Sequence, residues 1–540
     1  MFKLITNIFI FLVIHQIVWT QTQDIWIYFK DKPLAAEQLL NPTDFLSQKS
    51  IDRRIRYNIP FDLTDAPIDQ DYFNTVSQVE GIEVIAKSKW LNGMHLRVTS
   101  EALTILSTNE SIMSIQYLDH TKRPIQRTTT IDRSKKLDVI TFENYGTASN
   151  QIDMLNGRIL HDNGFTGRGM QIAVIDAGFI NVNTMGAFQR LRDNNQILGT
   201  YNFIENTTNV YGHHYHGTMV LSTLAGYIEN EYIGMAPDAS YYLFLTEDAS
   251  QEHPYEESLW IEAAEKADSL GVDVLTTSLG YTEFDNPAYN HTYDDLDGNT
   301  TIISRGSKIA TEKGMLVINS AGNWGNNLWH YIGAPADVEN VLSIGAVDPN
   351  GIIASFSSWG PTSDGRLKPD VCAQGAKVSV INTSNEIVSS NGTSFSGPII
   401  AGLATCLWQA YPNETPQKIR DIIKKSSHKY NSPDNHYGYG IPNFETAFGF
   451  LNISDIEQIQ MTIYPNPVKR NSILNITVQE LSSITKMYLY DLQGKLIKQS
   501  EISKSNYYLE TSNINPGMYF LHLANNSGSK TFKLLITNDI

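Results

Sequence analysis

The chain has 540 residues, enough for several domains, because a typical domain contains about 100–200 residues. Its 57 Asp and Glu side chains outnumber its 40 Lys and Arg side chains, which gives a net charge of −17. No basic cluster interrupts this acidity, so the composition argues against nucleic acid as a partner.

Residues 1–20 have the outline of a secretory signal peptide. Lys3 precedes an apolar run at residues 8–14, and a polar Gln-Thr-Gln follows at residues 21–23. A membrane anchor is the alternative, but the run is shorter than the ~20 residues that a membrane-spanning helix needs. No other segment is apolar enough to cross a bilayer, so we expect no membrane span in the mature chain.

Residues 21–120 predict a small α+β domain, a common size for an independent fold. Strand-like runs at 26–29, 82–85 and 95–98 accompany helix-like stretches at 45–56 and 99–106. The polar, Thr-rich segment at 121–144 that follows is typical of an exposed, cleavable linker.

Residues 145–452 predict an α/β domain, because strand-like runs alternate with helix-like runs and this order implies parallel pairing. The first apolar strand ends in Asp176 and a glycine turn. Open α/β sheets bind their ligands at the carboxyl ends of such strands. We therefore expect Asp176, Ser278 and Asn323 to collect along one edge of the sheet.

Two further motifs supply the partners that a catalytic carboxylate needs. His216 precedes an apolar helix-like run, and Ser394 lies in Asn-Gly-Thr-Ser-Phe-Ser-Gly-Pro at the start of another. Pro398 fits the first turn of that second helix, where its missing N–H breaks no helical bond. A glycine-flanked serine at a helix N-terminus has the fixed backbone and the positive partial charge that a nucleophile requires. A plain helix cap is the alternative for the serine motif alone.

The order Asp176, His216, Ser394 resembles that of the subtilase family of serine endopeptidases. The resemblance covers roughly residues 140–450. It implies that Ser394 is the nucleophile, His216 the general base, Asp176 the residue that orients the histidine, and Asn323 the oxyanion donor. No cofactor is assigned with certainty. His213 and His214 compete for the base role, but only His216 directly precedes Gly-Thr as the family pattern requires.

The resemblance also implies a substrate cleft for proteins or peptides. Two segments resemble those that pair with the substrate backbone and wall the primary pocket: Ser278, Leu279 and Gly280; Ser320, Ala321 and Gly322. Trp324 lies beside Asn323 in the sequence, and it either forms an apolar rim of the cleft or packs as an ordinary buried side chain. The rival to a secreted endopeptidase is a catalytically silent, subtilase-like surface-binding protein.

Many subtilases carry an inhibitory propeptide, which the resemblance implies for residues 21–120; a permanent N-terminal domain is the alternative. The acidic run Asp294-Asp-Leu-Asp-Gly298 has oxygen ligands that suit calcium, although a solvated turn explains it as well and no metal ligand is assigned. Cys372 and Cys406 are too few for a disulfide framework, and a bond between them stays open.

Residues 457–540 predict a β-sandwich, because short alternating strands such as 474–478 and 487–490 are separated by turns. Tyr464-Pro-Asn-Pro467 and Gly517-Met-Tyr-Phe520 resemble the C-terminal sorting domain of the type IX secretion pathway of Bacteroidetes. This resemblance implies the type IX machinery as a partner and a secreted or cell-surface protein that crosses the outer membrane. A carbohydrate- or surface-binding sandwich is the alternative.

Overall fold

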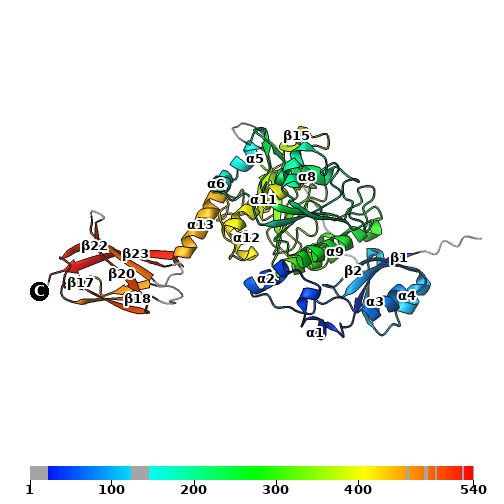
Figure 1. Cartoon of the computed structure of the whole chain (residues 1–540). Coiled ribbons are helices and arrows are strands. Elements are labelled where there is room, and N and C mark those ends of the chain that lie inside the picture. Colours follow the sequence, from blue (N-terminus) through cyan, green and yellow to red (C-terminus); the bar gives the residue numbers. More distant parts are fainter. Residues whose placement is uncertain are drawn as a thin grey trace, which may run out of the picture. The chain divides into compact units, whose positions relative to one another are not determined.

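The computed structural model describes residues 22–122, 145–457, 461–478, 485–492, 495–525 and 528–538. The predicted signal peptide and nearly all of the predicted linker lie outside these residues. The chain divides into two compact units, Met1–Asn443 and Phe444–Ile540 (Figure 1). The predicted boundaries of the smaller domains remain predictions.

The N-terminal part of the first unit is an antiparallel sheet with two helices on one face. Its strands, in the order β2-β3-β1-β4, are β1 (Gln23–Phe29), β2 (Ile82–Ser88), β3 (Gly93–Val98) and β4 (Ile112–Tyr117). The two helices are α3 (Gln70–Ser77) and α4 (Ser100–Leu106). Asp69 starts α3 by accepting hydrogen bonds from the N–H groups of Asp71 and Tyr72. The predicted α+β fold is confirmed; helix α3 and strand β4 were not predicted.

The two faces of this sheet pack against different partners. Ile25, Ile27 and Phe29 share a core with α3 and α4. Trp26 lies on the opposite face, because side chains alternate along a strand. It packs with helix α9 (Tyr255–Leu270) of the α/β part, which the sequence predicts to be catalytic and which is called the catalytic part for that reason. The N-terminal sheet is therefore docked on the catalytic part through its second face.

The catalytic part is built on a seven-stranded parallel sheet in the order β13-β12-β11-β10-β5-β9-β6. Its strands are β5 (Gln171–Asp176), β6 (Ile197–Asn202), β9 (Ser240–Leu245), β10 (Val274–Thr277), β11 (Leu316–Ser320), β12 (Leu342–Val347) and β13 (Val371–Gln374). Helices α8 (His216–Ala225) and α11 (Thr393–Ala410) cover one face, and α9 and α10 (Ile302–Glu312) the other (Figure 1). The predicted parallel α/β core is confirmed.

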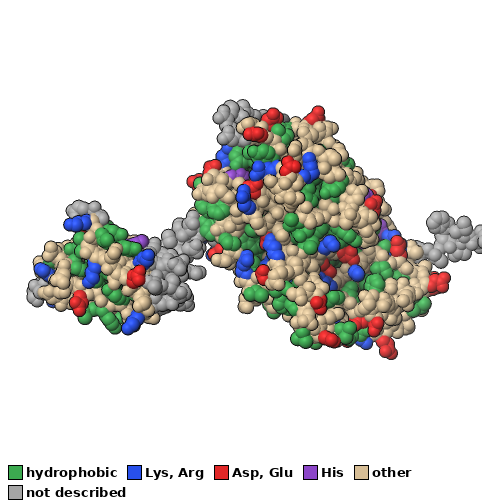
Figure 2. All heavy atoms as spheres, in the orientation of Figure 1, with side chains coloured by type: hydrophobic (Ala, Val, Ile, Leu, Met, Phe, Trp, Pro, Cys, Tyr) green, Lys and Arg blue, Asp and Glu red, His purple; other side chains and the backbone are tan. Residues whose placement is uncertain are grey.

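Shorter elements complete the first unit. They are α1 (Ala35–Gln38), α2 (Gln48–Arg56), α5 (Ser149–Asp153), α6 (Arg158–Asp162), α7 (Gln189–Asp193), α12 (Pro416–Lys425), and the hairpins β7 (Tyr227–Ile228) with β8 (Tyr232–Ile233) and β14 (Val378–Ile381) with β15 (Ile387–Ser390). No helix among the described residues combines the length and apolarity that a membrane span requires. Figure 2 shows Lys and Arg side chains scattered over the visible face rather than gathered in one continuous patch.

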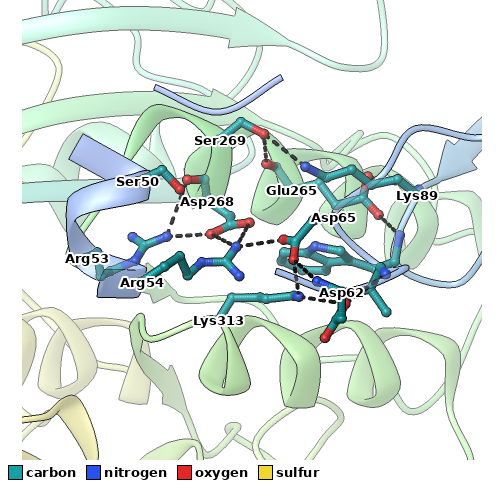
Figure 3. Close-up of polar contacts among 12 residues, drawn as sticks. Ser50, Arg53, Arg54, Asp62, Asp65, Lys89, Glu265, Asp268, Ser269 and Lys313 are labelled. Atoms are coloured by element: carbon teal, nitrogen blue, oxygen red, sulfur yellow. Dashed lines mark hydrogen bonds and ion pairs between the residues drawn. The ribbon is translucent and has the colours of Figure 1, made fainter. Parts of the chain in front are cut away.

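A buried ion network joins α2 to the catalytic part (Figure 3). Arg54, which is fully buried, pairs with Asp268 of α9 at 2.7 Å and with Asp65 at 2.9 Å. Arg53 also pairs with Asp268, and Lys313 pairs with Asp65 at 2.9 Å. Asp65 and Asp268 are fully buried, so each carboxylate needs the cations that surround it.

The second unit begins with helix α13 (Phe444–Glu457), which was not predicted, and continues as two sheets. One sheet contains β16 (Met461–Tyr464), β18 (Ile473–Val478) and β21 (Asn506–Glu510); the other contains β17 (Val468–Lys469), β23 (Gly528–Thr537), β22 (Gly517–Asn525), β19 (Thr485–Tyr490) and β20 (Leu496–Ile502). Leu474 and Leu509 of the first sheet share one core with Leu489 and Leu521 of the second. The predicted β-sandwich is confirmed.

Candidate active site

Asp176 and His216 are joined directly at the carboxyl edge of the parallel sheet. Asp176 ends β5 and is fully buried, and His216 begins α8 with 24% of its side chain exposed. The distance from His216 Nδ1 to Asp176 Oδ1 is 2.8 Å. Burial lowers the pKa of His216, but the charge of Asp176 and this hydrogen bond outweigh burial and raise the pKa above its usual value. The contact fixes the ring and leaves Nε2 as the nitrogen available to a nucleophile.

Ser394 lies in the first turn of α11 and is 94% buried, with 6% of its surface exposed. Its Oγ donates a hydrogen bond to the backbone oxygen of Ser278 at 3.4 Å. The ring of the next residue, Phe395, has its centroid 6.1 Å from that of His216, so serine and histidine motifs are neighbours. Among the described residues no hydrogen bond joins Ser394 to His216, as is common in substrate-free sites, where catalytic contacts tighten on binding.

Pro398 lies inside α11 rather than in its first turn, because the helix begins at Thr393. The expectation that its missing N–H breaks no helical bond is therefore wrong. In a helix the N–H of residue 398 would donate to the carbonyl of Ser394, four residues earlier. Ser278 Oγ donates to that carbonyl instead, at 2.8 Å. One predicted substrate-binding residue thus completes the hydrogen bonding of the backbone at Ser394.

Asn323 is exposed and its amide is oriented by Thr393. The Oδ1 atom of Asn323 accepts hydrogen bonds from Thr393 N at 2.8 Å and Thr393 Oγ1 at 3.0 Å. A backbone N–H can only donate, so the amide oxygen must face Thr393 and the NH₂ group must point away from it. A Cβ atom built on Gly392 would lie 3.7 Å from Asn323 Nδ2 and 3.6 Å from Ser394 Cβ. The amide donor therefore lies close to the turn that carries Ser394.

The predicted substrate-binding segments follow two adjacent strands. Ser278, Leu279 and Gly280 come after β10; Ser320, Ala321 and Gly322 continue from the end of β11. Asn319 ties the two segments together, because its Nδ2 donates to the oxygen of Leu279 at 3.0 Å and to that of Ser320 at 2.9 Å. Sequence reasoning did not identify this bridge.

Trp324 packs against a glycine of each segment, Gly280 and Gly322, and against Gly333. A Cβ atom built on Gly322 would lie 2.3 Å from the Trp324 ring, one on Gly333 2.9 Å, and one on Gly280 3.5 Å. The indole therefore occupies the space that these missing side chains leave open.

The two other histidines of this motif, His213 and His214, have different surroundings from His216. His213 contacts Glu205 and Asn202, at 3.4 and 3.1 Å, and has a φ of 68°. The ring centroid of His214 is 6.4 Å from that of His216. Of these three histidines, only His216 hydrogen-bonds to Asp176 in the described part of the chain.

The acidic run at 294–298 forms a turn whose carboxylates accept backbone hydrogen bonds. Asp297 Oδ1 accepts from the N–H groups of Asn299 and Thr300, both at 2.7 Å. Asp295 Oδ2 accepts from Thr292 N at 2.8 Å. Calcium at this turn remains a prediction.

Cys372 and Cys406 are both free and buried.

Comparison with protein families assigns the three main parts of the chain. The profile of the subtilase family, peptidase S8, matches residues 167–440, which is half of the chain. The profile of the peptidase S8 propeptide domain of Bacteroidota matches residues 24–135, and that of the secretion system C-terminal sorting domain matches residues 462–537.

Known relatives agree with this assignment. The chain is 29% identical over 292 residues to a thermostable alkaline protease of Halalkalibacterium halodurans, covering 54% of this chain and 70% of the relative. It is 27% identical to the serine protease AprX of Bacillus subtilis, covering 52% and 66%, and 29% identical to subtilisin DY of Bacillus licheniformis, covering 53% and 92%. The chain therefore belongs to the subtilase family and is a serine-type endopeptidase with a propeptide domain and a C-terminal sorting domain for secretion.

Proposed function

We propose that this endopeptidase cleaves peptide bonds through an acyl-enzyme on Ser394, with His216 as general base and Asp176 as its orienting carboxylate. The 2.8 Å contact between His216 Nδ1 and the buried Asp176 carries the proposal, because it leaves Nε2 as the proton acceptor. A serine hydroxyl is a weak nucleophile at its own pKa, so it needs this base. His216 takes the proton of Ser394 Oγ as the hydroxyl attacks, and then gives it to the leaving amine.

Asn323 and the backbone N–H of Ser394 stabilise the oxyanion that forms in this step. The orientation of Asn323 by Thr393 supports the assignment, because its oxygen accepts from Thr393 N and Oγ1 and its NH₂ group is therefore directed away from them. The N-terminus of α11 adds a favourable partial positive charge. Preorganised donors of this kind commonly supply the largest single term in acyl transfer.

Substrate binds, we propose, along the segments 278–280 and 320–322. Backbone groups at the ends of β10 and β11 pair with the peptide on either side of the scissile bond. Trp324, which covers Gly280 and Gly322, narrows the pocket for the residue before that bond and favours small side chains there.

The enzyme is made as a zymogen that cleaves itself within residues 121–144. The docked N-terminal sheet and its propeptide match support this step. The sorting domain then directs the chain across the outer membrane through the type IX machinery. Deleting residues 457–540 should leave active enzyme in the periplasm; normal export of the truncated protease would assign another role to this domain.

Reaction with a fluorophosphonate probe tests the catalytic assignment. The wild-type enzyme should be labelled at Ser394, with the adduct found by mass spectrometry in the peptide that contains it. Ser394→Ala should remain folded by circular dichroism, take no label and stay full-length. His216→Ala should lose about as much peptide hydrolysis as Ser394→Ala, about 10⁶-fold in kcat, a magnitude carried over from subtilisin. Near-normal turnover in folded Ser394→Ala would overturn the assignment.

A further inference from the structure

We propose that the propeptide and the catalytic domain share a binding site for a divalent transition metal such as Zn²⁺, formed by His120, His291 and Asp295. One ligand atom of each residue lies within 4.8 Å of those of the other two. His120 begins a 3₁₀ turn at the end of the N-terminal part, whereas His291 and Asp295 belong to the catalytic part. The cluster therefore spans two regions that are far apart in the sequence.

His291 has the surroundings of a metal ligand. It is 92% buried, with 8% of its surface exposed, and its Nε2 lies 2.9 Å from Oε1 of Glu257 on α9. Its Nδ1 has no hydrogen-bond partner among the described residues. Metal-binding histidines commonly donate their second ring N–H to a carboxylate, which fixes the tautomer and leaves the other nitrogen for the metal. A buried ring nitrogen without a partner is otherwise costly.

The other two residues are placed to complete the site. The distance from His120 Nδ1 to Asp295 Oδ2 is 3.7 Å, and the ring centroids of His120 and His291 are 5.6 Å apart. Asp295 is held in place by Thr292, whose N–H and Oγ1–H both donate to its Oδ2 at 2.8 Å. Metal-binding carboxylates are typically supported by such hydrogen bonds.

The three residues line a small cavity of about 20 Å³. A space of this size holds about one water molecule, and so could take an ion. Pro254, Phe284 and Tyr289 line it as well, which limits access of water. Bonds of about 2.0–2.1 Å to zinc place tetrahedral ligand atoms roughly 3.3 Å apart, so the site closes on an ion through a small shift of the partly exposed His120.

The donor set selects the class of metal. Two imidazole nitrogens and one carboxylate oxygen suit zinc and similar transition metals, with a fourth position open to water. Calcium prefers six to eight oxygen ligands, so this donor set, although it includes Asp295 of the acidic turn 294–298, does not suit calcium. One consequence rests on the proposed self-cleavage within residues 121–144. After that cleavage, the bound metal ties the new C-terminal end of the propeptide to the catalytic domain and delays release of the propeptide.

Zinc binding to the full chain tests the proposal. Ser394→Ala protein, shown to be intact by mass spectrometry and stripped of metal, should bind one equivalent of Zn²⁺ in a calorimetric titration. Co²⁺ should give the visible absorption of a four-coordinate site. His120→Ala, a change at a partly exposed residue that should leave the fold intact, and Asp295→Asn should each weaken Zn²⁺ binding about 100-fold. The adjacent, exposed Asp294→Asn is the matched control and should bind as the parent does.

Two outcomes overturn the proposal. One is the absence of a saturable site at equimolar Zn²⁺ in the intact parent chain, which would make the pair His291–Glu257 a simple buried ion pair beside a water-filled cavity. The other is a site whose affinity is the same in His120→Ala and Asp295→Asn as in Asp294→Asn. Neither outcome bears on the catalytic role of Ser394, which the fluorophosphonate experiment tests separately.

Discussion

Replacing Arg54 by alanine tests how the propeptide domain is held on the catalytic part. The guanidinium is fully buried and pairs with two buried carboxylates, Asp65 and Asp268. Removing one partner of a buried ion pair costs about 3–5 kcal/mol, because a buried charge loses its compensation. Here Asp65 keeps Lys313 and Asp268 keeps Arg53, so we expect the lower end of that range, about 3 kcal/mol.

Hydrogen exchange measures this loss in the intact chain. In full-length protein carrying Ser394→Ala, the amides of β3 should exchange about 10²-fold faster when Arg54→Ala is added, since 1.4 kcal/mol corresponds to a factor of ten. Lys49→Ala is the matched control. Lys49 pairs with Asp273 at 2.5 Å, but 36% of its side chain is exposed, so removing it should cost at most about 1 kcal/mol.

A third variant separates charge from packing. Arg54→Met keeps most of the side-chain volume and removes the charge, so it should destabilise about as much as Arg54→Ala if the ion network holds the domains. Equal exchange rates in Arg54→Ala and Lys49→Ala would refute the reasoning. A nearly neutral Arg54→Met beside a costly Arg54→Ala would assign the loss to packing instead.

Three further predictions concern the active site. Asn323→Ala should lower kcat about 10²–10³-fold, the magnitude known for subtilisin, with little change in KM, because the donor acts mainly on the transition state. A rise in KM as large as the fall in kcat would contradict this role of Asn323. The kcat/KM value should fall as the pH falls through the raised pKa of His216, since only the neutral ring accepts a proton. In Asp176→Asn this acidic fall of the residual activity should occur at lower pH, because burial without the Asp176 charge lowers the pKa of His216. An acidic fall at the same pH in both proteins would contradict the role of Asp176. Trp324→Ala should raise the ratio of kcat/KM for a peptide with a large side chain before the scissile bond to kcat/KM for the matched peptide with alanine there. An unchanged ratio would mean that the indole lies away from the pocket.

The order of elements and the position of the chemistry followed from local sequence. Apolar strands alternating with helices predict a parallel sheet, and in such a sheet the residues after each strand meet at one edge. Asp176 at the end of β5 and Asn323 just after β11 lie where this rule puts them. His216 is the first residue of α8 and Ser394 lies in the first turn of α11, as their motifs predict. These features depend on periodicity and chain order, which a sequence states directly.

Hydrogen-bond partners distant in the sequence could not be predicted in this way. The carbonyl of Ser394 is satisfied by Ser278, 116 residues away, because Pro398 has no N–H to offer. The amide of Asn323 is oriented by Thr393, 70 residues away. Each contact needs two loops to meet with ångström precision, and only the packing of α11 on the sheet sets that distance.

The interface between the propeptide and the catalytic part likewise became visible only in the tertiary structure. Arg54, Asp65 and Asp268 look like ordinary surface charges in the sequence, because charged residues are seldom fully buried unless they are paired. His120 and His291 have no metal-ligand spacing in the sequence, and only docking of the N-terminal sheet on α9 brings them together. Sequence determined which chemistry each segment can carry, whereas burial and pairing across domains, which depend on the folded arrangement, decided which of these groups meet.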